Sequence, residues 1–198
     1  MRTNSRNKLD RLVEFMFEVG TLRKTLRSHR QTLLTDDLSD NIASHSYRTI
    51  IIGYLLAKRE KVDAAKVVLM CLVHDLPESR TGDQNWVHKK YVKVYETEAI
   101  RDQLSGLTED NELYDLALEY SKRNTKESKI AKDADLLDQV LLLKEYANNG
   151  NKEAKSWLEG REQEKRMYSK TAKELAVRIR NNKIHCWWDN LWTSDSRK

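Results

Sequence analysis

The chain has 198 residues, of which 36 are Lys or Arg and 31 are Asp or Glu, so its formal net charge is +5. One proline and six glycines provide few tight turns and favour long helices, and the length suits one domain. We therefore expect a single compact all-α domain over residues 1–198. No apolar run reaches 18 residues and no signal-peptide pattern is present, which excludes a membrane-spanning protein and predicts a soluble, cytoplasmic one.

The positive charge is distributed among negative charge rather than gathered in blocks. Residues 122–129, for example, mix Lys and Arg with Glu and polar side chains. This pattern is typical of a solvated helix surface, and the basic residues form no stripe with interleaved aromatics. Nucleic-acid binding is therefore not expected, whereas a small substrate that carries phosphate would be attracted by the positive field.

The first predicted helices come from apolar spacing. Leucine, valine and methionine recur at helical intervals over residues 9–19 and predict a helix that ends near Gly20. Residues 31–41 are polar and are interpreted as a loop. The next helix is predicted to begin with Ser44 as its N-cap, which places His45 in the first turn.

A third helix is predicted over residues 63–74, with Asp63 as its N-cap. Pro77 is expected to end it, because a proline disfavours α geometry in the residue before it. Further helices are predicted over residues 87–104, 109–120, 129–147 and 166–180.

Two histidines and two aspartates stand at the ends of these predicted helices. His74 and Asp75 follow an apolar run, His45 opens the preceding helix, and Asp135 lies near the start of the helix over 129–147. Imidazole with carboxylate suits divalent ions such as Mn²⁺, Fe²⁺, Co²⁺, Ni²⁺ or Zn²⁺ and leaves coordination positions open. Each group alone has a simpler interpretation, as a hydrogen-bonded helix end or as acidic residues favoured near a helix N-terminus. Together they indicate a metallohydrolase.

The motifs around these residues carry a resemblance to a known family. They are Ser-His-Ser at 44–46, His-Asp-Leu-Pro-Glu at 74–78, Thr-Gly-Asp at 81–83 and Lys-Asp-Ala-Asp at 132–135. Their order resembles the HD-domain metal-dependent phosphohydrolases, and within them the small 5′-deoxynucleotidase branch, over residues 19–188. The resemblance implies a helical HD-domain bundle with one divalent metal ion (Mn, Co, Fe, Ni, Zn or Mg) between its helices. The metal ligands it implies are His45, His74, Asp75 and Asp135.

The resemblance also implies catalytic and substrate-binding residues. Glu78 and Asp83 would be catalytic, orienting or deprotonating the attacking water and assisting the leaving group, and Arg27 would bind the substrate phosphate. The implied reaction releases phosphate from deoxynucleoside 5′-monophosphates by attack of a metal-activated water. Ser44 departs from the family pattern, which usually has Glu there to orient the following histidine. No Trp or Tyr closely follows Arg27, where the branch often has an aromatic that binds the base.

Two other functions stay open on the sequence. A nucleoside triphosphohydrolase could use the same metal site if the pocket had more cationic room for the two additional phosphates. An inactive nucleotide-binding HD module would keep the metal without turnover, as the two departures suggest. In each case the partner is a small nucleotide rather than a membrane, and a homo-oligomer, a dimer or larger, is expected.

The other histidines and the cysteines have simpler interpretations. His29 is expected to be solvated, His88 to be a surface residue or a contact at the rim of the site, and His185 to pack with neighbouring aromatics. Cys71 and Cys186 are expected to be buried free thiols rather than a disulfide. The tryptophans expected to close a core or a subunit interface are Trp157, Trp187, Trp188 and Trp192.

Overall fold

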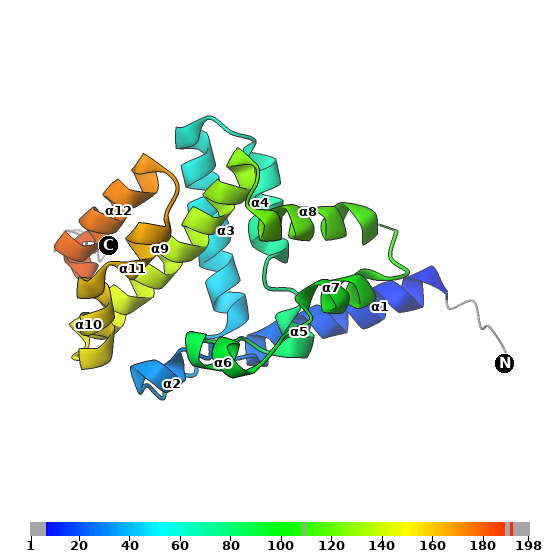
Figure 1. Ribbon diagram of the computed structural model, residues 1–198, viewed down its shortest axis with the longest axis horizontal. Coiled ribbons are helices and arrows are strands. Elements are labelled where there is room, and N and C mark those ends of the chain that lie inside the picture. The colour runs from blue at the N-terminus through cyan, green and yellow to red at the C-terminus, as the bar shows by residue number, and fades with distance from the viewer. Residues whose placement is uncertain (1–6, 109, 189–190, 192–198) are drawn as a thin grey trace, which may run out of the picture.

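The computed structural model describes residues 7–108, 110–188 and 191. Within these ranges the regular structure is helical, apart from one isolated antiparallel bridge between Leu26 and Asn41. Figure 1 shows the helices packed around α3 and α9, which cross near the middle of the molecule. The prediction of an all-α fold is confirmed. No helix in the described part of the chain is long and apolar enough to span a membrane.

The helices follow one another through short connections, and several successive pairs pack as neighbours. In chain order they are α1 (Lys8–Val19), η1 (Gly20–Lys24), α2 (Arg30–Leu33), α3 (Ile42–Glu60), α4 (Ala64–Val73), α5 (Glu78–Thr81), α6 (Trp86–Tyr91), α7 (Glu96–Leu104), α8 (Asp110–Lys122), α9 (Lys126–Asn148), α10 (Lys152–Gly160), α11 (Glu162–Arg166), α12 (Lys170–Asn181) and η2 (Ile184–Trp187).

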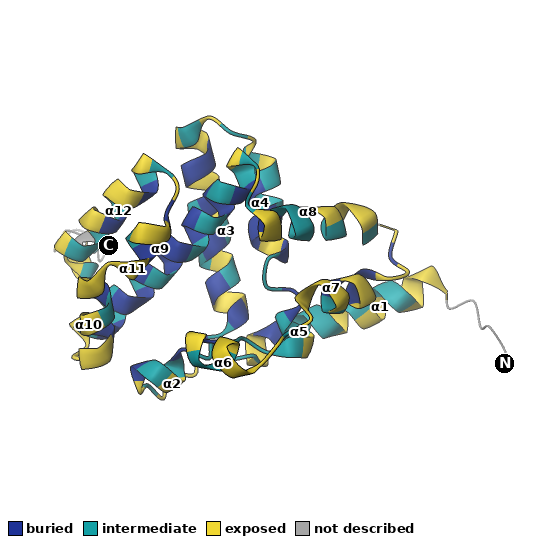
Figure 2. Ribbon diagram, viewed as in Figure 1, coloured by how far each residue is buried: buried dark blue, intermediate teal, exposed yellow. Residues whose placement is uncertain are grey.

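The core lies where α3, α4 and α9 meet, and Figure 2 shows buried residues concentrated on these helices. α9 is buried on most of its circumference because α3, α4, α10 and α12 all pack against it. α3 and α4 approach closely at Gly53, where an added Cβ would lie 2.7 Å from Sγ of Cys71. Cys71 is a buried free thiol, as predicted, while the side chain of Cys186 lies outside the described residues.

The boundaries predicted for the first and third helices are confirmed. α1 ends at Gly20, and Asp63 caps α4 by accepting a hydrogen bond from the backbone N–H of Lys66 at 3.1 Å. α4 ends at Val73, before Pro77, and Pro77 in turn begins the short helix α5. The proline therefore both ends one helix and sets the direction of the next.

The N-cap predicted for α3 is wrong. Asn41 caps the helix, and its side chain accepts a hydrogen bond from the backbone N–H of Ser44 at 3.0 Å. Asn41 has the extended backbone that an N-cap requires, whereas Ser44 already lies inside the helix. His45 still lies near the helix start, where its N–H donates to the Asn41 carbonyl.

The single helix predicted over residues 87–104 is two helices, α6 and α7. Asn85 caps α6 by accepting hydrogen bonds from the backbone of Val87 and His88. The backbone becomes extended at Val92 (φ −118°, ψ 128°) and ends α6. β-branched residues favour this extended geometry, which the helical spacing of the neighbouring apolar residues concealed.

Further differences concern two helices that were not predicted and two helix starts. α2 lies within the segment around residues 31–41 that was predicted to be a loop, and α10 was not predicted. α9 begins before the predicted residue 129, because Thr125 and Ser128 form a capping box. α12 begins after the predicted residue 166, because Ser169 caps it and accepts a hydrogen bond from the backbone N–H of residue 172.

Candidate metal centre

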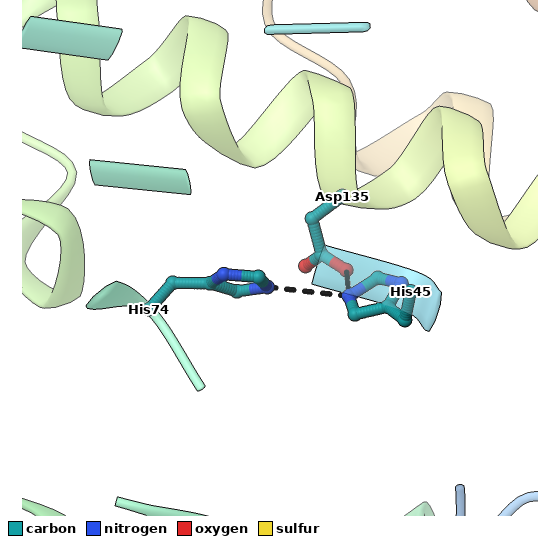
Figure 3. Close-up of side chains that lie close together, drawn as sticks. All are labelled: His45, His74 and Asp135. Atoms are coloured by element: carbon teal, nitrogen blue, oxygen red, sulfur yellow. Dashed lines mark hydrogen bonds and ion pairs between the residues drawn. The ribbon is translucent and has the colours of Figure 1, made fainter. Parts of the chain in front are cut away.

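His45 and His74 lie with their Nε2 atoms facing each other at the centre of the fold. His45 is buried near the start of α3, and His74 is the residue at which α4 ends. Their Nε2 atoms are 3.2 Å apart, and Figure 3 shows both rings directed toward the same point below α9. Nδ1 of His74 donates to the carbonyl of Cys71 at 2.7 Å, which leaves its Nε2 free to bind a metal.

Two carboxylates reach the same point, one from α9 and one from the residue that follows His74. Oδ1 of Asp135, on α9, lies 3.4 Å from Nε2 of His45. Oδ2 of Asp75 lies 3.4 Å from Nε2 of His45 and 3.2 Å from Nε2 of His74. The two histidines and Asp135 each place one donor atom within 4.8 Å of the others, and Asp75 joins them through its contacts with both imidazoles. All four residues predicted as ligands therefore converge.

The donor set fits a divalent cation. It offers two imidazole nitrogens and two carboxylate oxygens from three separate regions of the chain, which is the mixture that first-row divalent ions accept. Burial and the charge of Arg27 lower the pKa of His45, but hydrogen bonds to Asp135 and Asp138 outweigh them and raise it to about 9. The carboxylates thus favour positive charge at His45, and a divalent ion would supply that charge in place of a proton.

Asp138 holds His45 in place from behind. Nδ1 of His45 donates to Oδ2 of Asp138 at 2.6 Å, so that Nε2 is the ring atom turned toward the other donors. Arg48 pairs with the same aspartate and also, at 2.6 Å, with Glu145. The orienting carboxylate that Ser44 does not provide is therefore supplied by Asp138 on α9.

Glu78 begins α5, beside the proposed ligands. Its Oε2 is buried and has no hydrogen-bond partner. Burial, and then the charges of Asp75 and Asp83, raise the pKa of Glu78 to about 10. A nearby divalent cation would favour the ionised form again. Glu78 is therefore an uncommitted carboxyl group whose proton affinity depends on the charge beside it.

Arg27 and Asp83 lie together on the same side of the site. Oδ2 of Asp83 accepts a hydrogen bond from the backbone N–H of Ser28 at 2.6 Å and lies 3.7 Å from Nε of Arg27. Nη1 of Arg27 lies 3.9 Å from Asp75, yet Nε and Nη1 are buried without hydrogen bonds. Burial lowers the pKa of Arg27, but the charges of Asp75 and Asp83 outweigh it and raise the pKa. Its buried N–H groups are available to an oxyanion.

These residues line one cavity of about 330 Å³, with His45 just behind its wall. The sequence did not single out several other residues of this cavity. Lys132 lies 2.5 Å from Oδ2 of Asp135, and the Tyr120 hydroxyl donates to the same oxygen at 3.2 Å. Arg123 and Trp86 also line the cavity. Lys132 is the first residue of the Lys-Asp-Ala-Asp motif, so the motif could have indicated it. No local sequence pattern distinguishes Tyr120, Arg123 or Trp86.

Trp157, predicted to close a core or an interface, lines this cavity and also packs against the core. His185 packs 4.9 Å from the ring of Trp188, as predicted. Trp192 lies outside the described residues. The prediction for His29 is wrong, because it is buried and its Nε2 donates to Asp40 at 2.9 Å.

A helical bundle that gathers two histidines and two aspartates beside a cavity with an uncommitted carboxyl group has the features of a metal-dependent hydrolase. Comparison with known proteins agrees with this class. A family model described as HD domain matches residues 19–177, so the chain belongs to the HD-domain family, as its motifs implied.

Individual relatives support the same assignment. The chain is 33% identical over 148 residues to the 5′-deoxynucleotidase HDDC2 of Dictyostelium discoideum, covering 68% of this chain and 76% of that protein. A conserved hypothetical protein from Pyrococcus furiosus is similar in structure, with a TM-score of 0.71, 25% identity and coverage of 86% of this chain and 99% of that one. A predicted metal-dependent phosphohydrolase from Magnetospirillum magnetotacticum has a TM-score of 0.63 at 26% identity, covering 88% and 94%.

Proposed function

We propose that this protein is a metal-dependent phosphomonoesterase that releases phosphate from deoxynucleoside 5′-monophosphates. One observation carries the proposal. Four side chains of the kinds that bind metal ions converge beside two groups that are buried without hydrogen bonds, Oε2 of Glu78 and the Nε and Nη1 atoms of Arg27. This arrangement provides a cation site, a proton acceptor and an oxyanion receptor within one cavity. The names of relatives such as the Dictyostelium deoxynucleotidase support the substrate class.

His45, His74, Asp75 and Asp135 would hold one divalent ion. When bound, the ion supplies a Lewis acid that lowers the pKa of water and neutralises charge on the phosphate. The ion could be Mn, Co, Fe, Ni, Zn or Mg, since the mixed donor set does not select one of them strongly.

The remaining steps belong to side chains of the cavity. Glu78 orients the attacking water and takes its proton, because its carboxyl group is buried, uncommitted and next to the ligands. Arg27 donates its free N–H groups to phosphate oxygens and positions the phosphorus for attack. Asp83 fixes the backbone beside Arg27 through Ser28. The proton taken from the water would return, through Glu78 or Asp83, to the departing sugar oxygen.

The preference for deoxyribose is the finer part of the proposal. A phosphate held between the proposed ligands and Arg27 would leave the sugar edge near the turn Thr81-Gly82-Asp83. Gly82 has φ +69° there, and Thr81 is committed, since its hydroxyl donates to the Pro77 carbonyl at 3.2 Å. A 2′-hydroxyl would gain no ready partner at this turn, which favours deoxyribonucleotides.

The test is a phosphate-release panel of the common dNMPs, NMPs and dNTPs with Mn²⁺, Co²⁺, Mg²⁺ and Zn²⁺ in turn. We expect inorganic phosphate from dNMPs at higher kcat/KM than from NMPs. Triphosphate release from dNTPs as the main activity would replace the proposal with a triphosphohydrolase. Nucleotide-dependent thermal stabilisation without turnover under any metal would indicate an inactive binding module.

We further propose that residues 1–198 act as one domain in the cytoplasm and assemble as a homo-oligomer. An exposed apolar stripe on α3, formed by Tyr47, Ile51, Tyr54 and Leu55, supports self-association. Light scattering of the purified protein should give a mass of at least twice 23.3 kDa. A monomeric mass at micromolar concentration would contradict the homo-oligomer. Cell fractionation separately tests whether the protein is in the cytoplasm.

A further inference from the structure

Arg123 has an unusual backbone at the C-terminal end of α8. Its φ is +54°, and its N–H donates to the carbonyl of Glu119 at 3.2 Å. Glycine or asparagine usually occupies this left-handed position, because a larger side chain is strained there. Leu34, Lys61 and Arg161 also have positive φ, so the backbone alone does not set Arg123 apart. Its side chain does.

The guanidinium of Arg123 stacks on an aromatic ring, and one of its nitrogens is buried without a hydrogen bond. Its Cζ lies 3.4 Å from the ring centroid of Tyr120, and its Nη1 is buried with no hydrogen-bond partner. No carboxylate among the described residues forms an ion pair with it. In contrast, Lys132 is paired with Asp135, and Arg27 lies within 4 Å of two carboxylates. Arg123 is thus a partly buried cation of the cavity wall that has no ion pair in the part of the chain that the structure describes.

Tyr120 connects this guanidinium to the metal centre. Its hydroxyl donates to Oδ2 of Asp135 at 3.2 Å, and its ring meets that of His74 edge-on at 5.2 Å. Arg123 is therefore one aromatic ring away from a proposed ligand, on the Asp135 side of the cavity. Arg27 lines the same cavity, next to Asp83. An anion at the metal centre would therefore share its cavity with two arginines.

We propose that Arg123 is a second phosphate-binding residue, whose free Nη1–H donates to a non-bridging oxygen of the substrate phosphate. Stacking on Tyr120 holds the plane of the guanidinium, so that little side-chain freedom is lost when the anion binds. The charge-assisted hydrogen bond complements that of Arg27, which lines the same cavity. This inference rests on the proposed function, because it assumes that the anion at the metal centre is a phosphate. The competing interpretation is structural, with Arg123 only covering the face of Tyr120.

Calorimetric binding of inorganic phosphate to the metal-loaded full-length protein tests the inference without turnover. Arg123→Gln keeps much of the side-chain length but removes the charge, and we expect about 10- to 100-fold weaker phosphate binding. Arg123→Lys should recover part of this loss, because the charge returns without the planar fork. Lys122→Gln is the matched control: it removes one positive charge from the neighbouring exposed residue and should leave affinity unchanged.

A second variant separates binding from folding. Arg123→Gly removes the whole side chain at a backbone position that suits glycine, so it should fold and keep its metal while losing phosphate affinity as Arg123→Gln does. With a dNMP substrate, both variants should raise KM more than they lower kcat. A purely structural role would lower the melting temperature and leave phosphate affinity intact.

The outcomes distinguish this inference from the proposed function. Turnover of dNMPs with unchanged phosphate affinity in Arg123→Gln would overturn the role of Arg123 and leave the function standing. A silent wild-type enzyme whose phosphate binding falls in Arg123→Gln would keep the anion site and overturn the function. Wild-type protein that binds no phosphate would overturn the inference.

Discussion

Oδ2 of Asp138 lies 2.6 Å from Nδ1 of His45, joining the middle of α9 to the start of α3. The aspartate is itself fixed by Arg48, so it cannot turn away from the ring. Because Nδ1 is engaged, Nε2 of His45 faces Asp135 and His74. One buried hydrogen bond therefore sets both the tautomer and the direction of a proposed metal ligand.

Asp138→Asn should weaken metal binding about 10- to 100-fold, because the amide cannot stabilise the ligating ring as a carboxylate does. Metal titration of the purified variant measures this. Asp133→Asn is the matched control on the same helix: Asp133 is also buried, but it accepts hydrogen bonds from the backbone of Tyr168 and Ser169. It should lose stability and keep metal affinity. Wild-type metal affinity in Asp138→Asn would contradict the role given to this residue.

His74→Ala should lose the metal, the activity and the metal-dependent part of the thermal stability together, because it removes one of four donors. Elemental analysis of protein purified without chelator is the direct measurement, and chelation of the wild type should reproduce the effect. His185→Ala, at an exposed histidine that packs on Trp188, should change neither quantity. Full metal content and turnover in His74→Ala would refute the ligand assignment.

Glu78→Ala should keep the metal and lose about 10²- to 10⁴-fold in kcat, the usual scale for a positioned acid or base. Metal content and rate are measured on the same preparation, with Glu98→Ala on the exposed side of α7 as control. If Glu78→Ala instead loses its metal, Glu78 is a ligand, and the division between binding and chemistry is wrong.

Trp86 places an aromatic ring in the wall of the cavity, although no Trp or Tyr closely follows Arg27 in the sequence. It is 65% exposed and lines the cavity, so a base could stack on it. Stacking does not discriminate among bases, and we expect weak base selectivity. Trp86→Ala should raise KM about 10-fold for all four dNMPs, a change near the lower end of measured stacking energies. Trp187→Ala, also exposed but outside the cavity, should leave KM unchanged. An effect on one base alone would point to hydrogen-bond recognition instead.

Gly53→Ala should destabilise the fold by about 1–3 kcal/mol, because the new methyl group would overlap Sγ of Cys71 and press on Val67 where α3 meets α4. Denaturant unfolding measures the change. Gly160→Ala makes the same substitution at the end of α10, where an added Cβ meets nothing within 4 Å, and it should be nearly neutral. Equal stability of the two variants would contradict the close helix crossing.

Several features of the fold follow from interactions between residues close in the sequence. The end of α1 at Gly20, the Asp63 cap and the break before Pro77 were all predicted, since capping and apolar spacing act within a few residues. The predictions of Ser44 as an N-cap and of a single helix over residues 87–104 were wrong for a related reason. There two local signals competed, and the sequence alone did not rank them.

The sequence by itself was enough to predict an all-helical fold, the HD-domain family and the four residues that converge. Spacing and motif are local, and they sufficed to predict which four side chains come together. Only the tertiary structure decided what surrounds these residues. Asp138 behind His45, Tyr120 against Asp135 and the unpaired Arg123 are brought together by the packing of α3, α8 and α9. Helix packing joins residues tens of positions apart, and no short-range pattern records which of their faces will meet.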